Sequence, residues 1–285
     1  MKRLLRWIGI GAGVLVLLGA VAYAVVYVMS ERLFGRHYDA PAGALTVPSD
    51  AASIAEGRRL ATLRGCLGCH GKDGEGTVLF DDPLIARIVA PNLTRAVRKY
   101  NDAELVTIIR HGLRPDGRSV VVMPSEEFVA LTDEDLGRII AYMKTLPAAD
   151  GPDPAVSLGP LGRIGLVLGQ YQTTAQIIAG TVPPPDSAQP QAAAGRYLAR
   201  TICAHCHGTD LRGASNPDFT APALQIVAAY SPEAFTQFLR TGVALGGREL
   251  RVMSGVARKQ LHDLSDDEIA ALYSYLHAIP YAAPH

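Results

Sequence analysis

The chain holds four cysteines, and they occur as two pairs that are each followed directly by a histidine. The first group is Cys66, Cys69 and His70, and the second is Cys203, Cys206 and His207. Two cysteines separated by two residues and followed by histidine are the attachment signature of a c-type haem. The thiols add to two porphyrin vinyl groups as thioethers, and the turn between them places the imidazole under the iron as an axial ligand. The sequence therefore predicts two covalently bound haem c groups.

Two other uses of paired cysteines remain as alternatives. A structural zinc needs four nitrogen or sulfur ligands, usually with the second pair at short spacing. Here the second pair follows 137 residues after the first. A redox-active dithiol is typical of a βαβ setting, which the sequence lacks. We therefore favour haem over zinc and over a dithiol.

The sixth ligand of each iron is predicted among the five methionines. Met123 and Met253 occupy matching places, after a glycine-containing loop and before the last predicted helix of each half. Met1 and Met29 belong to the N-terminal segment, and Met143 lies on the apolar face of a predicted helix. A lone methionine is more often core filler than ligand. Because the other two recur as a pair, they are the predicted axial ligands.

Three further side chains are candidates around the haems. His262 lies near Met253 and is the rival ligand for the second iron, since imidazole also binds haem iron. Tyr100 and Tyr230 occupy equivalent places in the two halves and are candidates to bond the haem propionates. The arginines and lysines near Tyr100 are expected only to be solvated.

These residues belong to an internal repeat. Behind the Cys–His groups, matching residues recur at separations of 130 to 133. In the first copy they are Pro91, Leu93, Tyr100, Arg110, Gly112, Gly117, Arg118, Met123, Tyr142 and Pro147; in the second they are Pro222, Leu224, Tyr230, Arg240, Gly242, Gly247, Arg248, Met253, Tyr275 and Pro280. The separation changes only in stretches that have loop composition, so two copies of one unit are the simplest account. We expect domains at residues 49–148 and 189–285.

Each copy is expected to be helical. The predicted helices are Ile54 to Leu63, Asp102 to His111 and one from Thr132 in the first copy, and Ala194 to Ile202, Pro232 to Thr241 and one from Ser265 in the second. Their N-caps are Asn101, Thr132, Ser231 and Ser265, and Pro147 and Pro280 are expected to end the last helices. Apolar residues at helical spacing give each last helix one buried face. No stretch alternates well enough to predict a strand, so the expected fold class is all-α.

Residues 1–30 predict a membrane anchor. The run from Ile8 to Met29 carries no charge, and a helix of its length is about 33 Å long, enough to cross a bilayer. Lys2, Arg3 and Arg6 precede it, which favours a cytoplasmic N-terminus and haem domains on the periplasmic side of a bacterial inner membrane. A cleaved signal peptide is the main alternative, because residues 22–24 resemble a cleavage site, although the apolar run continues past them. A buried helix of a soluble protein is the other alternative. Residues 31–48 are expected to be a juxtamembrane linker.

Residues 149–188 are predicted to be a proline-rich inter-domain linker. Seven prolines lie between residues 148 and 190, a density expected to prevent a regular helix, and Pro183 to Pro185 should be stiff and extended. The apolar middle, Leu161 to Ile178, is too rich in Leu, Ile and Val for a solvated linker. It is expected to pack on a domain surface or on a partner.

The composition excludes two classes of protein. Lys and Arg number 27 and Asp and Glu number 27, so the chain lacks the basic excess of a nucleic-acid-binding protein. At 48% hydrophobic residues it is also too apolar for a disordered chain.

Together with the two Cys–His groups, three local motifs make the chain resemble class I cytochrome c. They are Pro-Asn-Leu-Thr at Pro91 to Thr94, Met-Pro at Met123, and the closing Tyr-x-x-x-Leu-Pro that ends at Pro147. The likeness covers nearly all of residues 50–147 and 190–281. The first copy is most similar to the cytochrome c subunits of membrane-bound bacterial alcohol and gluconate dehydrogenases. Those subunits usually carry three haem domains, whereas this chain has two.

The resemblance implies small all-helical haem domains whose irons have histidine and methionine ligands. It also implies that Pro91 and Pro222 pack beside the proximal histidines. The second copy departs from the pattern, because Met253 is followed by Ser254 instead of proline.

An iron with both axial positions filled binds no substrate, so the sequence predicts an electron-transfer protein and not an enzyme. The expected function is that of a membrane-anchored dihaem cytochrome that passes single electrons between respiratory-chain partners. Those partners are a membrane dehydrogenase, a cytochrome bc-type complex or a haem-copper oxidase. A dihaem redox enzyme, peroxidase-like or thiosulfate-oxidising, is the alternative and needs one open iron. A haem-based sensor is disfavoured because no output domain is recognisable.

Overall fold

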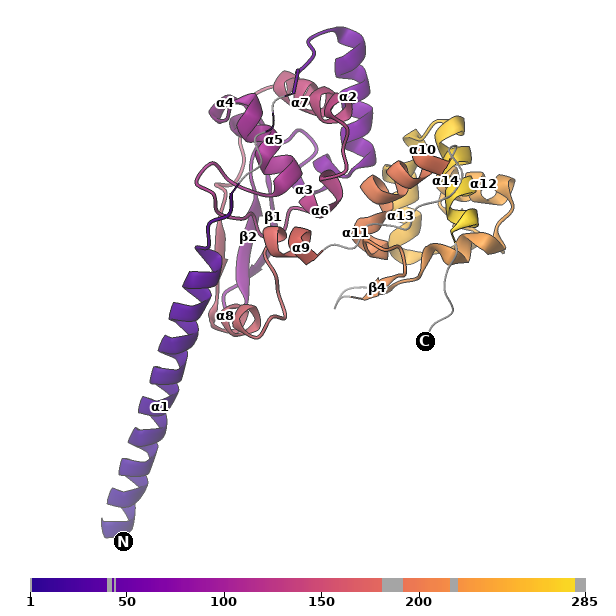
Figure 1. Ribbon diagram of the computed structural model, residues 1–285. Coiled ribbons are helices and arrows are strands. Elements are labelled where there is room, and N and C mark those ends of the chain that lie inside the picture. The colour runs from indigo at the N-terminus through magenta and orange to yellow at the C-terminus, as the bar shows by residue number, and fades with distance from the viewer. Residues whose placement is uncertain (1, 40–42, 44, 181–191, 216–219, 280–285) are drawn as a thin grey trace.

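The computed structural model describes residues 2–39, 43, 45–180, 192–215 and 220–279. The helices up to the middle of the chain are α1 Lys2–Phe34, α2 Ala51–Leu63, α3 Cys66–His70, α4 Leu93–Lys99, α5 Asp102–His111, α6 Ser125–Phe128, α7 Asp133–Thr145, α8 Pro160–Val167 and α9 Thr174–Gly180. Those that follow are α10 Ala192–Leu198, the π-helical η1 Ala199–Cys203, α11 Ala204–His207, the 3-10 turn η2 Leu224–Ala229, α12 Pro232–Thr241, α13 Arg251–Lys259, the 3-10 turn η3 Leu261–Asp263 and α14 Asp266–Ala278. The described chain is thus mostly helical (Figure 1).

Capping residues set the helix starts as predicted. Asn101, Thr132, Ser231 and Ser265 each accept a hydrogen bond from the backbone N–H three residues on, which satisfies one free donor of the first turn. The bounds predicted for α5 and α12 are confirmed at both ends. The helix α7 ends at Thr145, just before Pro147, whereas Pro280 lies outside the described residues.

The helices that lead into the Cys–His groups differ from their predicted bounds. The first begins at Ala51, three residues before the predicted start. The second was predicted to run from Ala194 to Ile202, but α-helical geometry stops at Leu198 and the chain continues as a π-helix through Cys203. This wider turn connects α10 directly to the second attachment motif.

The prediction that no strand forms is wrong. The strands are β1 Thr77–Asp82, β2 Ala86–Ala90, β3 Val156–Leu158, β4 Ala214–Ser215, β5 Thr220–Ala221, β6 Val243–Ala244 and β7 Arg248–Glu249. The first three form an antiparallel sheet in the order β1-β2-β3, with Thr77 opposite Ala90 and Ile88 opposite Val156. Residues 78–81 of β1 are all exposed, so this strand has no alternation of buried and exposed side chains for the sequence to reveal.

The segment between the two repeats is ordered up to Gly180, and the expectation that proline prevents a regular helix there is wrong. Pro160 is in the first turn of α8, where its missing N–H costs nothing. The strand β3 pairs with β2, and α9 packs against α6, so much of this segment lies on the first repeat. Pro183 to Pro185 lie outside the described residues.

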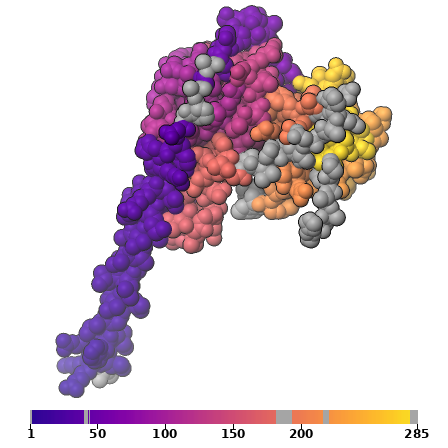
Figure 2. All heavy atoms as spheres, in the orientation of Figure 1, coloured from indigo at the N-terminus to yellow at the C-terminus, as the bar shows by residue number. Residues whose placement is uncertain are grey.

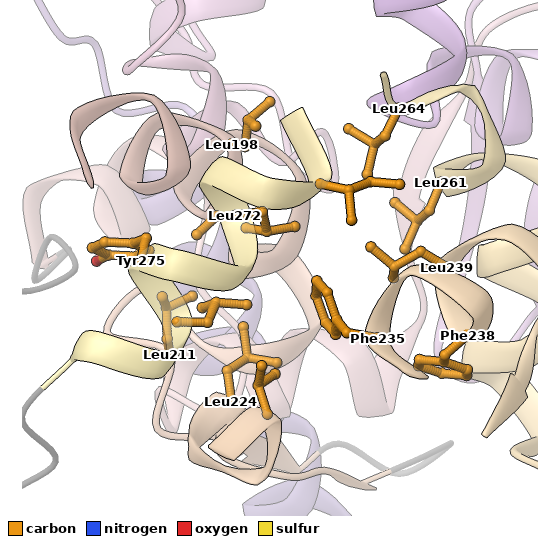
Figure 3. Packing of buried hydrophobic residues seen from close by; sticks show 14 of the residues in the cluster. Leu198, Leu211, Leu224, Phe235, Phe238, Leu239, Leu261, Leu264, Leu272 and Tyr275 are labelled. Carbon is orange, nitrogen blue, oxygen red and sulfur yellow. The ribbon is translucent and has the colours of Figure 1, made fainter. Parts of the chain in front are cut away.

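Two hydrophobic cores form, one for each repeat. The predicted apolar face of α7 is buried at Leu136, Ile139, Ile140 and Met143, among side chains from α2 and α5. The second core gathers α10, α12 and α14 around Leu272 and other buried side chains (Figure 3).

Each core depends on one close crossing of two helices at a glycine. A Cβ at Gly57 of α2 would lie 1.9 Å from the carbonyl oxygen of Arg138 on α7. A Cβ at Gly195 of α10 would lie 2.1 Å from the carbonyl oxygen of Ala271 on α14. Because neither approach leaves room for a side chain, glycine is required at both crossings. The two crossings are equivalent and support the duplication inferred from the sequence.

The two repeats also contact each other. Arg59 of α2 donates hydrogen bonds of 2.7 and 2.9 Å to the carboxylate of Glu268 on α14. Arg64, whose side chain is 1% exposed, lies 3.2 Å from both Asp135 of α7 and the hydroxyl of Tyr197 on α10. Leu63 of α2 is part of the second core. These contacts join α2 and α7 of the first repeat to α10 and α14 of the second.

The helix α1 extends away from the rest of the chain (Figures 1 and 2). Its most apolar window has a mean hydropathy of 2.3 and is 0% buried, so the helix is a candidate membrane span by length and composition. A signal sequence would meet the same criterion. The helix continues to Phe34 and therefore includes the first four residues of the predicted juxtamembrane linker.

Two candidate haem sites

Each attachment motif folds into a short helical turn. The first motif forms α3, Cys66–His70, which is separated from the end of α2 by two residues. In the second, η1 ends at Cys203 and α11 continues through His207. Residues three apart lie on one side of a helical turn, so the two thiols of each motif share a face and the imidazole follows directly. The local backbone therefore suits attachment of one planar group along a single edge.

The two histidines of the motifs bind the same kind of backbone acceptor. Nδ1 of His70 lies 2.8 Å from the carbonyl oxygen of Pro91, and Nδ1 of His207 lies 2.8 Å from that of Pro222. A carbonyl can only accept, so Nδ1 carries the proton and Nε2 is the free nitrogen that can bind a metal. Burial lowers the pKa of both imidazoles, against the hydrogen bond to the carbonyl, which raises it. Both rings are therefore held neutral and oriented as iron ligands must be.

A glycine keeps each proline carbonyl against its histidine. The N–H groups of Gly76 and Gly213 donate to the carbonyls of His70 and His207 at 2.7 and 2.8 Å. Both glycines have positive φ, 87° and 93°. A Cβ on either would lie 2.7 or 2.8 Å from the backbone oxygen of the residue before the proline. A side chain at either position would push the segment that carries the proline away from the histidine ring.

The four thiols are free; Cys69 is exposed and the other three are partly buried. Burial raises the pKa of Cys66 to about 11 and that of Cys203 to about 12, and it also raises the pKa of Cys69 and Cys206. Two free thiols on one short turn, followed directly by an imidazole, are the donor set that thioether attachment of a haem requires.

A zinc site would also need further ligands near the cysteines. Among the described residues, the one group of three or more potential ligands is formed by Glu126, Glu127 and His205. It includes none of the four thiols, which also argues against structural zinc at either motif.

In each half, candidate haem-binding residues pack against the hydrophobic core of that half. Cys66, Tyr100 and Met123 all pack against the first core, whereas Cys203, Tyr230 and Met253 pack against the second. In each half, one cysteine, the candidate methionine and the candidate tyrosine thus contact the same hydrophobic core. Ligation of iron by the two methionines stays a prediction.

The two methionines differ in their local backbone. Met123 lies in the loop before α6, where its carbonyl oxygen accepts a 2.9 Å hydrogen bond from Thr174 Oγ1 of α9. Met253 lies in α13, a helix that the sequence did not predict. The N-cap position of α13 is Leu250, whose side chain makes no capping hydrogen bond, so no start signal marks this helix.

The two candidate tyrosines are equivalent in the structure. Tyr100 is the C-cap of α4 and Tyr230 is the C-cap of η2. The ammonium of Lys99 lies 5.0 Å from the centroid of the Tyr100 ring. The ring of Tyr230 packs against Phe235 and Phe238 of α12. Their proposed bonds to propionates stay a prediction.

The remaining histidines near the sites face other groups. His262, the rival ligand, is in η3 with Nε2 3.2 Å from the carboxylate of Asp263. His205, in the second attachment turn, has Nδ1 3.3 Å from Oε1 of Glu127 in α6. No local pattern predicted this second contact, because it joins two repeats whose relative position only the folded chain reveals.

The two repeats match models of two families. Residues 54–147 match the family described as cytochrome c, and residues 190–276 match the family described as cytochrome c oxidase, cbb3-type, subunit III. The matched ranges cover both attachment motifs and both candidate methionines.

Curated relatives carry consistent names. Over 81% of its length the chain is 26% identical to the fructose dehydrogenase cytochrome subunit of Gluconobacter japonicus. It is 24% identical, over 85% of its length, to the cytochrome c subunit of the quinone-dependent alcohol dehydrogenase of Komagataeibacter europaeus. It is 26% identical, over 80%, to the gluconate 2-dehydrogenase cytochrome c subunit of Pantoea cypripedii. The matched part spans 53%, 59% and 60% of these three relatives.

Proposed function

We propose that this chain, a class I cytochrome c that resembles the cytochrome subunits of fructose, alcohol and gluconate dehydrogenases, binds two haem c groups and transfers single electrons. When bound, each haem supplies an iron that alternates between the ferric and ferrous states. The chain supplies the covalent attachment, both axial ligands and the electrostatic surroundings of the iron.

The residues of each site have distinct tasks in this proposal. Cys66 and Cys69 hold the first haem, and His70 is its proximal ligand. Cys203, Cys206 and His207 do the same for the second. The carbonyls of Pro91 and Pro222 hold the proton on Nδ1 of the histidines, 2.8 Å away, which leaves Nε2 for the iron and strengthens it as a ligand. Met123 and Met253 would each supply a second protein ligand to the iron, which would keep water and substrates from it.

The observation that carries this proposal is the duplicated arrangement of motif, histidine and proline carbonyl. Each half holds two protonated thiols on one turn, a neutral imidazole after them, and the same 2.8 Å contact that fixes its tautomer. Two independent copies of an arrangement of this kind favour two equivalent cofactor sites.

We further propose that α1 anchors the chain in the bacterial inner membrane, with the haem domains on the periplasmic side. The charge-free run and the basic residues before it support this orientation. The names of the relatives favour a membrane dehydrogenase that oxidises an alcohol or a sugar as the electron donor. A cytochrome bc-type complex or a haem-copper oxidase is then the acceptor or the alternative partner.

Two variants test the axial ligands. A ferric haem with histidine and methionine ligands has a weak absorption band at the red end of the visible spectrum. We expect Met123→Ala and Met253→Ala each to remove about half of this band while both haems stay attached. Met143→Ala is the matched control, since Met143 is buried in the first core, and it should keep the whole band. If both ligand variants also keep it, the assignment of the methionines is wrong.

Co-purification tests the partner. The full chain, tagged at the C-terminus and extracted from its native membranes in mild detergent, should bring a dehydrogenase with it. Addition of that enzyme's substrate should reduce both haems. Recovery with oxidase subunits alone would contradict the proposed donor and leave the haem assignment in place.

A further inference from the structure

Apolar side chains that face solvent occur on α8, on the residues just after it and on the β1–β2 hairpin against which α8 lies. They are Phe80, Leu84, Leu161, Ile164, Leu168 and Tyr171, and we call them the α8 patch. Three of them, Leu84, Leu161 and Leu168, are 56%, 54% and 67% exposed. A soluble protein rarely leaves so many large apolar side chains uncovered in one place, so the patch calls for a covering surface.

Backbone hydrogen bonds hold the residues of the α8 patch in a defined position. The N–H of Leu161 donates a 2.8 Å hydrogen bond to the carbonyl of Leu84, and the N–H of Gly159 donates one of 2.9 Å to that of Ile85. A Cβ at Gly162 would lie 2.0 Å from the backbone oxygen of Ile85, so α8 lies directly on the hairpin turn. These contacts hold the patch in place relative to the first haem domain.

The same helix is also fixed to the end of α1. The guanidinium of Arg163 donates hydrogen bonds to Ser30 Oγ at 2.8 Å and to the carboxylate of Glu31 at 2.6 Å. Its carbon lies 4.1 Å from the centroid of the Tyr27 ring. Ser30 is completely buried by this contact. Figure 1 shows α8 beside the C-terminal part of α1, below the other helices of the first domain.

This contact sets the depth of α8 relative to a bilayer. The charge-free run of α1 ends at Met29, and Arg163 contacts the helix at Tyr27, Ser30 and Glu31. Because α1 is one continuous helix from Lys2 to Phe34, this contact places α8 beside the end of the charge-free run. If α1 spans the membrane, α8 lies at the level where the hydrocarbon core gives way to the headgroups.

The segment that contains α8 carries little charge, as expected where the hydrocarbon core of a bilayer meets the headgroups. From residue 157 to residue 180 the only side chain that is charged at neutral pH is Arg163, and its charge is paired with Glu31. Tyr171 of the patch adds an aromatic side chain of the kind that is enriched at membrane interfaces. The segment therefore presents apolar surface, with no unpaired charge, at the depth where lipid would meet it.

We propose that the α8 patch is buried in the interfacial layer of the outer leaflet, so that the first haem domain rests on the membrane surface. The inference depends on the proposed membrane anchor, because α1 is what brings the patch to the bilayer. It gives the apolar segment between the repeats a function, as a second point of membrane contact that fixes the domain's orientation. Lipid is favoured over a partner protein because α8 lies against α1, whose most apolar stretch is itself fully exposed.

Spin-label accessibility tests the inference on the full chain. In the holoprotein all four native cysteines are expected to be attached to haem, so one introduced cysteine can be labelled selectively. We use Leu168→Cys for the patch, Val16→Cys for the middle of α1, and Val252→Cys, 49% exposed on α13, as the aqueous control. Leu84→Cys is a second patch probe. Each labelled protein is reconstituted into phosphatidylcholine vesicles with the haems reduced, and collision with oxygen is compared with collision with a water-soluble nickel chelate.

We expect the oxygen-to-nickel ratio at positions 168 and 84 to exceed that at position 252 at least threefold and to approach that at position 16. Ratios at both patch positions equal to that at position 252, with a bilayer ratio at position 16, would overturn the inference and leave the anchor intact. An aqueous ratio at position 16 as well would overturn the anchor itself. A patch that is aqueous in vesicles but protected in a purified complex would show that a protein covers it, which also contradicts the proposal.

Discussion

The crossing of α10 and α14 gives a prediction whose size follows from the structure. A Cβ at Gly195 would lie 2.1 Å from the carbonyl oxygen of Ala271 and 2.6 Å from Cβ of Tyr275, a fully buried side chain. Both obstacles are fixed parts of α14, so the helices must separate by roughly 1 Å. Overpacking costs about 1–3 kcal/mol, and the upper end applies where backbone must move. Replacing glycine by alanine within a helix also stabilises that helix by about 1 kcal/mol, which offsets part of this cost.

We therefore expect Gly195→Ala to lower the free energy of unfolding by about 2 kcal/mol. The matched control is Gly255→Ala in α13, where a Cβ would meet no atom within 4 Å. There only the gain in helix propensity remains, so the control should be more stable than the parent by about 0.5–1 kcal/mol. Guanidinium titrations of the holoprotein in detergent, followed by far-ultraviolet circular dichroism, measure both. Equal stability of the two variants would refute the close crossing and the packing of the second core.

The contact between the repeats gives two further predictions. Burial raises the pKa of Glu268, but hydrogen bonds from Arg59 and from the backbone of Ser265 outweigh it, so the net pKa is below the usual 4.5. The pair therefore stabilises the fold above about pH 4.5, and this contribution is lost as the pH falls through the lowered pKa. Arg59→Gln should cost about 1 kcal/mol at pH 7 and less as the pH falls through the lowered pKa of Glu268 in urea titrations, and a pH-independent loss would contradict the ion pair. Leu63→Ala should lower the free energy of unfolding by about 2–5 kcal/mol and speed hydrogen exchange in α14 of the other repeat. The control Leu60→Ala should instead speed hydrogen exchange in α7 of its own repeat. The reverse pattern would contradict the place of Leu63 in the second core.

The parts of the fold that the sequence predicted well are those with local signals. Capping residues and a closing glycine give α5 and α12 their bounds, and repeated spacing identifies the two attachment motifs. The helix α13 has no capping side chain at its start, and the exposed strand β1 has no alternation, so neither produced a pattern.

The contacts between distant parts of the chain could not be predicted in the same way. Arg59 and Glu268 are separated by 209 residues, and nothing in either neighbourhood identifies the other. The same holds for Glu127 with His205 and for Arg163 with the end of α1. In the candidate sites the sequence supplied the residue types, and the family resemblance implied Pro91 and Pro222 beside the histidines; the hydrogen bond from each histidine to a proline carbonyl required the folded chain.

The central claim is that each Cys–His group carries one covalently attached haem. The intact mass of the full chain, matured in a host with c-type haem attachment machinery and measured under denaturing conditions, tests it most directly. We expect a mass that exceeds that of the polypeptide by two haem groups, and by one in either Cys66→Ala/Cys69→Ala or Cys203→Ala/Cys206→Ala. A polypeptide without added mass after the same maturation would contradict the account.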